Sequence, residues 1–131
     1  MDGTRGTNPG DPGQTVRHPL HKIWSELPQD EPMPGLTRRR VIGENVMLSH
    51  VFLEKGCVVP SHAHENEQMA AVLSGRMRFR LGEDEATTID VGAGELLHLP
   101  AMTPHAAEAL EDSLVLDVFS PPSEATGIDR V

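Results

Sequence analysis

The chain has 131 residues, enough for one domain with a compact core and too few for two domains of ordinary size. It carries 20 acidic against 11 basic residues, and its net charge of −9 would repel nucleic-acid phosphates and anionic membranes. Aromatic residues make up only 3% of the chain, which also disfavours stacking on nucleic-acid bases. We therefore expect a small-molecule substrate, no nucleic acid and no membrane partner.

The chain contains one cysteine, Cys57, and no apolar run long enough for a membrane helix. A single cysteine cannot form an intramolecular disulfide, which suits a reducing compartment. The N-terminus lacks the apolar stretch of a secretory signal peptide. These features predict a cytoplasmic protein.

Residues 1–15 are rich in Gly and Pro and contain no aliphatic residue after Met1. Such a segment buries too little apolar surface to offset its ordering entropy, so we expect a disordered tail. Residues 16–131 are then the folded domain. Within it, residues 25–35 contain three prolines and are predicted to be a connection.

From residue 37 onward, short apolar stretches alternate with Gly-containing turns, and no long window shows a helical period. The clearest stretch, residues 76–81, alternates arginine with apolar residues, which is typical of a half-buried strand. The same pattern predicts strands at residues 37–42, 45–54, 58–59, 68–73, 76–81, 86–91, 95–99, 106–110 and 114–119. Many short strands favour a single-domain all-β barrel or sandwich. Residues 120–131 are expected to leave the sheet and pack loosely.

Three histidines and one glutamine have the spacing of a metal site. His62 and His64 are two residues apart, so they project from the same face of a strand. Gln68 follows at an even spacing, and His105 lies after a strand whose end can reach the pair in an antiparallel barrel. This neutral ligand set leaves positions open for substrate or water and suits one divalent transition metal ion, either Zn, Ni, Mn, Fe or Co.

Asp117 lies in an otherwise apolar predicted strand, on the same face as Val115 and Phe119. Burying an unpaired carboxylate is costly, so a position facing a cavity predicts a general acid or base. The structural alternative is pairing with an arginine or capping of a turn. Phe119 is expected either to cover the pocket and exclude water or to fill the core.

Other polar residues are expected to lie outside the site. His98 stands between Leu97 and Leu99 and should face outward if those leucines fill the barrel. The arginines of residues 76–81 form a face that is either solvated or part of a dimer interface. Together with the N-terminal arm and the outward apolar residues, this face predicts a homodimer.

The motif spacing resembles the two signature motifs of the cupin superfamily, and the resemblance covers residues 38–122. The motifs are Gly56-x5-His62-x-His64-x3-Gln68-x6-Gly75 and Gly94-x5-Pro100-x4-His105. The resemblance implies a double-stranded β-helix, the jelly-roll or cupin barrel, with one metal ion bound by the three histidines and Gln68. The chain has Gln68 where Glu is usual, Met102 where Gly is usual and Ala109 where Asn is usual.

Further stretches are similar to small bacterial cupins that open the ring of 4,5-unsaturated monouronates during pectin and alginate degradation. They are Arg39-Arg40-x4-Asn45-x-Met47-Leu48, Asn66-Glu67-Gln68 and Leu116-Asp117-Val118-Phe119-Ser120-Pro121-Pro122. The resemblance implies an isomerase that yields a linear keto sugar, with Asp117 and Phe119 shaping catalysis. Position 123 is Ser, where that subgroup usually has Arg.

Three other functions are compatible with the sequence. An Fe(II) dioxygenase would use the open coordination positions for substrate and oxygen, and oxygen uptake would identify it. A metal-dependent lyase or polyketide cyclase is the second. The third is a non-enzymatic small-molecule sensor, which would need a protein partner because the sequence shows no DNA-binding domain.

Overall fold

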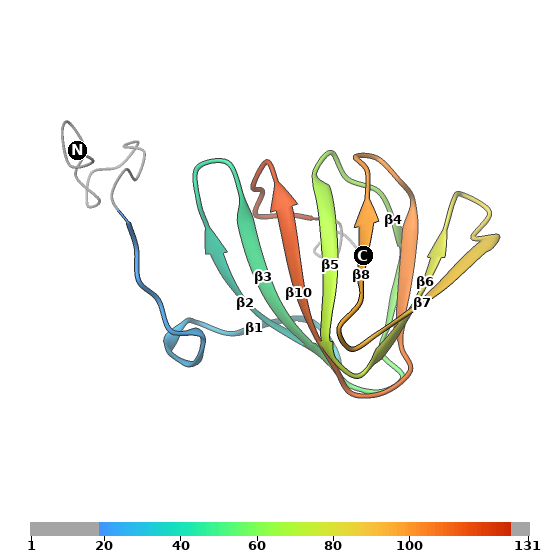
Figure 1. Cartoon of the computed structure of the whole chain (residues 1–131), viewed down its shortest axis with the longest axis horizontal. Helices are drawn as coiled ribbons and strands as arrows, with labels where there is room; N and C mark the ends of the chain where they lie inside the picture. The colour runs from blue at the N-terminus through green and yellow to red at the C-terminus, as the bar shows by residue number, and fades with distance from the viewer. Residues whose placement is uncertain (1–18, 127–131) are drawn as a thin grey trace.

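The structure is a computed structural model that describes residues 19–126, and within them it is almost entirely β (Figure 1). A short 3-10 helix, η1 (Trp24–Glu26), precedes ten strands. The strands are β1 (Asp30–Met33), β2 (Leu36–Ile42), β3 (Met47–Leu53), β4 (Val58–His62), β5 (Glu67–Ser74), β6 (Arg76–Leu81), β7 (Thr87–Gly92), β8 (Leu96–Leu99), β9 (His105–Ala109) and β10 (Ser113–Ser120). The tail predicted at residues 1–15, and both ends of the predicted domain, lie outside the described residues.

The strands form two antiparallel sheets that face each other. The six-stranded sheet has the order β1-β2-β3-β10-β5-β8, and the four-stranded sheet has the order β4-β9-β6-β7. In Figure 1 the two sheets converge at the lower end and spread apart at the upper end. This arrangement confirms the predicted all-β double-stranded β-helix.

Strand alternation places the core between the sheets, as the period of two predicts. On β6, Met77 and Phe79 are buried, while Arg78 and Arg80 point away from the core. The core is built from inward-facing aliphatic and aromatic side chains of both sheets. It includes Leu36, Val51, Leu53, Cys57, Val59, Ala70, Val72, Met77, Phe79, Val91, Ala107, Ala109 and Val115.

Two outward arginines of β6 are paired across neighbouring strands. Arg78 donates from Nε to Asp90 on β7 at 2.8 Å, and Arg80 donates to Glu108 on β9 at 3.3 Å. The arginine face is therefore a ladder of ion pairs on the four-stranded sheet. The predicted homodimer stays a prediction.

The prediction of a plain connection over residues 25–35 is wrong, because that stretch contains η1 and the edge strand β1. β1 pairs with β2, where Asp30 is opposite Arg38. Pro32 within β1 lacks an N–H donor, which an edge strand tolerates on its unpaired side. A strand this short that carries a proline has no periodic signal in the sequence.

The expectation of loose packing after Ser120 is also wrong for the described residues 121–126, which we call the C-terminal segment. Thr126 is only 3% exposed, and Arg40 donates from Nη1 to the Glu124 carbonyl oxygen at 2.8 Å. Asn66 donates its side-chain N–H to the Pro121 carbonyl oxygen. These partners come from distant strands, so the local sequence does not reveal them. Among residues 19–126, no helix is both long and apolar enough to cross a membrane.

Two motif glycines adopt left-handed conformations for different reasons. Gly75 has φ +84° between β5 and β6, and an added Cβ would collide with the Asp112 carbonyl oxygen and lie 2.7 Å from the Ser113 Cα. Gly94 has φ +86° in the turn before β8, and an added Cβ would meet nothing within 4 Å. Gly75 is thus required both by its backbone angle and by the close approach of another strand.

This contrast predicts different costs for the same substitution. Gly94→Ala should lower the free energy of unfolding by about 1–2 kcal/mol, the cost of a left-handed alanine. Gly75→Ala should cost about 2–5 kcal/mol, because the backbone clash adds to that strain. Urea denaturation of both variants measures the difference, and equal losses would show that the close approach at Gly75 carries no energetic weight.

Candidate metal centre

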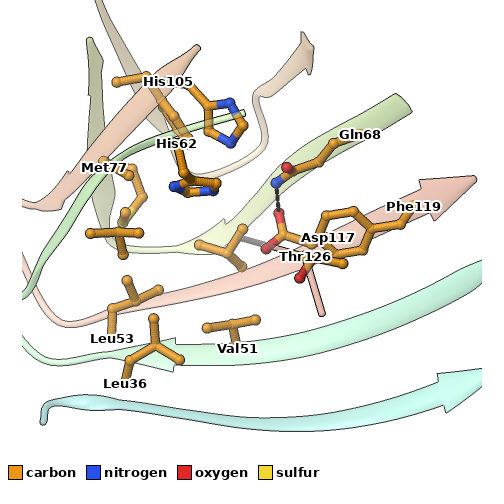
Figure 2. A pocket seen from close by; sticks show the side chains of 14 residues that line it. Leu36, Val51, Leu53, His62, Gln68, Met77, His105, Asp117, Phe119 and Thr126 are labelled. Atoms are coloured by element: carbon orange, nitrogen blue, oxygen red, sulfur yellow. Dashed lines mark hydrogen bonds between the residues drawn. The ribbon is translucent and has the colours of Figure 1, made fainter. Parts of the chain in front are cut away.

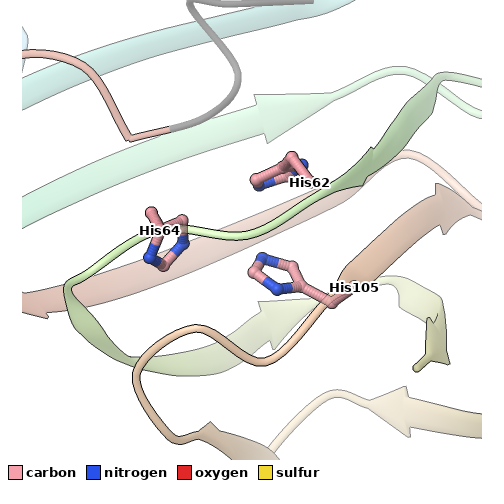
Figure 3. A group of neighbouring side chains, drawn as sticks. All are labelled: His62, His64 and His105. Carbon is pink, nitrogen blue, oxygen red and sulfur yellow. The ribbon is translucent and has the colours of Figure 1, made fainter. Parts of the chain in front are cut away.

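The three predicted histidine ligands lie together at one end of the barrel (Figure 3). His62 is the last residue of β4 and His105 the first of β9, and the two are direct partners in the antiparallel register. His64 lies in the loop between β4 and β5, where the Met102 backbone N–H donates to its carbonyl oxygen at 2.8 Å. One ring nitrogen from each histidine lies within 4.8 Å of the others.

Each ring is oriented by a hydrogen bond from its Nδ1 to a nearby backbone carbonyl oxygen. The distances are 2.9 Å from His62 to Pro60, 3.0 Å from His64 to Asn66 and 2.8 Å from His105 to Thr103. Because a carbonyl oxygen only accepts, Nδ1 must carry the proton in each case. A neutral ring then presents its Nε2 lone pair, which is the form that binds a metal ion.

Gln68 on β5 is oriented from the opposite side. Its amide N–H donates to Asp117 Oδ1 on β10 at 2.9 Å, which turns its Oε1 toward His64 Nε2 at 3.0 Å. Two lone pairs therefore face each other, since Nδ1 of His64 already carries that ring's proton. A cation bound to both atoms would remove this repulsion.

The charge states of the buried groups suit a cation. Burial lowers the pKa of His105 to about 4. The hydrogen bond to Thr103 acts in the opposite direction and raises this pKa, while repulsion from His62 and His64 lowers it further. Burial also raises the pKa of Asp117 to about 7, partly opposed by the hydrogen bond from Gln68. His105 is thus a neutral donor at ordinary pH, and Asp117 can change its protonation state near neutrality.

The donor set fits a divalent transition metal ion. His62, His64 and His105 could hold one, and Gln68 is positioned to add its amide oxygen. His64 Nε2 and Gln68 Oε1 lie 3.0 Å apart, so both atoms could bind the same ion. The ligand role of Gln68 stays a prediction.

A cavity adjoins the histidines inside the barrel (Figure 2). Its volume is about 40 Å³, which is room for a few water molecules. Its polar wall is formed by two of the histidines, Gln68, Asp117 and the Thr126 side chain of the C-terminal segment. The remaining wall is apolar and consists of Leu36, Val51, Leu53, Val59, Met77, Phe79, Ala107, Val115 and Phe119.

Asp117 and Phe119 both face this cavity, as strand alternation predicts for β10. Within residues 19–126, the carboxylate of Asp117 is paired with the Gln68 amide, and not with an arginine or a turn. The Phe119 ring packs against the His64 ring, with centroids 5.7 Å apart and planes at 72°. Their catalytic roles stay predictions, but both lie where those roles require.

The other singled-out residues lie apart from the cavity. His98 faces outward, 44% exposed, with its Nε2 2.6 Å from Glu67 Oε2. Cys57 packs in the core. Ser123 lines a separate polar groove beside His64, where its hydroxyl donates to the Ala125 carbonyl oxygen at 3.0 Å.

Sequence reasoning missed Thr126 as a wall of the cavity. Residues 120–131 show no strand period, and a threonine among Ser, Glu and Ala carries no signal for burial. It also missed the backbone carbonyls of Pro60, Asn66 and Thr103 as the groups that orient the ligands. Backbone partners depend on the local fold and not on residue type.

A two-sheet barrel with three histidines at its mouth is the architecture of a cupin. Residues 49–119, more than half of the chain, match the cupin domain family, and the chain belongs to that family. The structure of KdgF from Halomonas sp. is similar to it, with a TM-score of 0.71 and 31% identity over 78% of this chain and 94% of that one. An RmlC-like cupin from Shewanella frigidimarina NCIMB 400 shares the fold, with a TM-score of 0.74, 20% identity and coverage of 82% and 95%.

A more distant similarity connects the chain with oxalate decarboxylases. Oxalate decarboxylase OxdC of Bacillus subtilis (strain 168) is 29% identical over 77 residues, which is 57% of this chain and 20% of OxdC. The chain therefore spans about a fifth of the length of this curated relative. A structure of the Bacillus subtilis enzyme, which has Mn(II) centres, matches with a TM-score of 0.69 and 25% identity, covering 84% of this chain and 33% of that one.

The site predicts that metal binding depends on His105 and not on His98. The purified protein should contain about one equivalent of a transition metal, and His105→Ala should lose most of it, because removing a ligand leaves an incomplete site. His98→Ala should retain it, since that ring faces outward. Elemental analysis of both folded variants is the measurement, and equal metal content in the two would contradict the assignment.

Proposed function

We propose that this cupin is a metal-dependent isomerase that opens the ring of a small unsaturated uronate to a linear keto sugar. The observation that carries the proposal is the chain of contacts from Asp117 through Gln68 to His64. It puts a buried carboxylate next to a three-histidine centre in a mostly apolar cavity. The motif resemblance to uronate-opening cupins and the similarity to KdgF support the choice of substrate.

His62, His64, Gln68 and His105 would hold the metal ion. When bound, a divalent ion supplies Lewis acidity toward a substrate oxygen, and neutral ligands leave its full charge available for that purpose. The carbonyls of Pro60, Asn66 and Thr103 keep the rings in the metal-binding tautomer.

Asp117 is the proton carrier in this proposal. Its carboxylate accepts the proton of the anomeric hydroxyl as the bond from the anomeric carbon to the ring oxygen breaks. The ring oxygen keeps the electron pair of that bond and becomes an enolate oxygen. Return of the proton from Asp117 to the neighbouring alkene carbon converts the enolate to a ketone, so the reaction is an isomerisation that needs no co-reactant. A pKa of about 7 for Asp117 suits both accepting and returning a proton.

Phe119 and the apolar wall have a supporting role. They exclude bulk water from the space between Asp117 and the histidines, which strengthens the electrostatic interactions there. The Phe119 ring also limits the rotation of His64 through their edge-to-face contact.

The proposal predicts that Asp117→Asn lowers turnover by about 10²- to 10⁴-fold, because an amide cannot carry the proton. Metal content should stay near that of the unchanged protein, since Asp117 is not one of the proposed ligands. Loss of the vinyl proton of an unsaturated monouronate, followed by NMR, measures turnover. Glu83→Gln removes an exposed carboxylate in the turn between β6 and β7 and serves as the control. Normal turnover by Asp117→Asn at normal metal content would remove Asp117 from the mechanism.

A second candidate is metal-dependent lyase chemistry on a small organic acid. The similarity to oxalate decarboxylase favours it. Release of carbon dioxide from oxalate by the Mn(II)-loaded protein, without turnover of the uronate, would make this the leading function.

A further inference from the structure

The cavity lacks a cationic side chain that could recognise an acid. Among the described residues that line it there is no lysine or arginine, and Asp117 is itself acidic. A uronate carboxylate placed there would be desolvated without a partner, which is costly. Apart from a bound metal ion, the group that could pair with this carboxylate would be a cationic side chain just outside the lining, on the same inner face of the six-stranded sheet.

The strand register places such a residue in line with Asp117. Asp117 on β10 is the direct partner of Ser49 on β3, and Ser49 is the direct partner of Arg40 on β2. Directly opposed residues of antiparallel strands project from the same face. Arg40, Ser49 and Asp117 thus form one row across the inner face, and its two ends are roughly 10 Å apart at the backbone.

Ser49, in the middle of this row, carries a buried hydroxyl that has no hydrogen-bond partner among residues 19–126. Its side chain is 3% exposed and makes no hydrogen bond to any residue within the described part of the chain. Buried hydroxyls are normally hydrogen-bonded, so a polar atom of a ligand or a water is expected beside it.

Arg40 has binding capacity left, in contrast to its neighbour Arg38. Arg38 donates to both Asp30 carboxylate oxygens, with Nε and Nη2 each 3.0 Å from one of them. Arg40 lies 3.9 Å from Asp30, a long ion pair, and among residues 19–126 its close hydrogen-bond partner is the Glu124 carbonyl oxygen at 2.8 Å. The Glu124 carbonyl oxygen accepts from one N–H group of the Arg40 guanidinium. A guanidinium group can bind a carboxylate through two parallel N–H groups, so Arg40 retains donors for a ligand.

The C-terminal segment covers the same row. Glu124 contacts Arg40 at one end, and Thr126 lies beside Asp117 at the other (Figure 2). With Thr126 in place the cavity has only about 40 Å³, whereas pockets for small organic ligands start near about 300 Å³. A sugar-sized substrate therefore needs this segment to move, and that movement frees Arg40.

We propose that Arg40 and Ser49 form the carboxylate-recognition subsite of the metal cavity, and that the Glu124 carbonyl oxygen occupies Arg40 until a substrate carboxylate replaces it. The inference rests on the proposed function in one respect, which is that the substrate is a small carboxylic acid. Arg40 is a specificity-determining residue in this proposal, since it contacts the part of the substrate that does not react.

Two matched substrates test the assignment by turnover. The metal-loaded full chain should have a higher kcat/KM for an unsaturated monouronate than for its uncharged methyl ester. Arg40→Gln should reduce this ratio of kcat/KM values by about 10- to 100-fold, mainly by raising KM for the acid. Arg39→Gln is the control, because Arg39 is the adjacent arginine on the outer face and donates to the Leu27 carbonyl oxygen. Arg40→Lys should restore part of the preference, because it keeps the charge and loses the paired donors.

A binding measurement separates this inference from the proposed reaction. Calorimetric titration with galacturonate, a saturated uronate, should show about 10- to 100-fold weaker binding to Arg40→Gln than to Arg39→Gln. Ser49→Ala should weaken binding by a smaller factor without loss of stability in urea, because the hydroxyl has no partner to lose. Arg40-dependent galacturonate binding without turnover of the unsaturated uronate would support the subsite and reject the isomerase. Equal binding and equal acid preference in the Arg40 and Arg39 variants would overturn the subsite.

Discussion

The pairing of β4 with β9 is the constraint on which the site depends. It sets His62 directly opposite His105, and it adds β4 as the edge strand of the four-stranded sheet. The register shifts between Val59 and His62, so the strand is irregular just where the first ligand projects. Irregular strand ends re-aim side chains, and here the result is two imidazoles from distant parts of the chain with ring centroids 4.4 Å apart.

The six-stranded sheet supplies the groups that give this centre its chemistry. β5 contributes Gln68, and β10 contributes Asp117 and Phe119 beside it. The hydrogen bond between Asp117 and Gln68 has two effects, since it directs the amide oxygen toward His64 and partly offsets the cost of burying the carboxylate. The surrounding apolar wall strengthens both effects, because hydrogen bonds and charges interact more strongly away from water.

The inner face of the barrel is divided between packing and recognition. Its deep part is aliphatic and forms the core, while its upper part has a polar row that ends at Arg40. The C-terminal segment lies over this boundary, held to β2 by Arg40 and to the loop before β5 by Asn66. These contacts come from the side chains of β2 and of the loop before β5 and not from the hydrogen-bond ladders of the sheets, so displacing the segment would leave those ladders intact.

Much of the fold could be predicted because its signals are local. Alternation over residues 76–81 predicted the half-buried strand β6. The closeness of His62 and His64 was predicted correctly, but the expectation that both lie on one strand was wrong, because β4 ends at His62 and His64 lies in the following loop. The grouping of His105 with that pair followed from expecting an antiparallel barrel. The edge strand β1 was missed, because a short strand containing Pro32 has no period to detect.

The sequence by itself determined the fold class, the closeness of His62 to His64 and the inward position of Asp117, since each depends on alternation or spacing along one stretch of chain. The place of His105 beside that pair could be predicted only through the expected antiparallel barrel. Only the tertiary structure decided that Asp117 holds Gln68, that Thr126 closes the cavity and that Arg40 stands in line with Asp117. The first and third relations depend on the register between strands that are far apart in sequence, and the second depends on how the segment after β10 packs back over the barrel. Register is set by the packing of whole sheets, and no short stretch of residues encodes it.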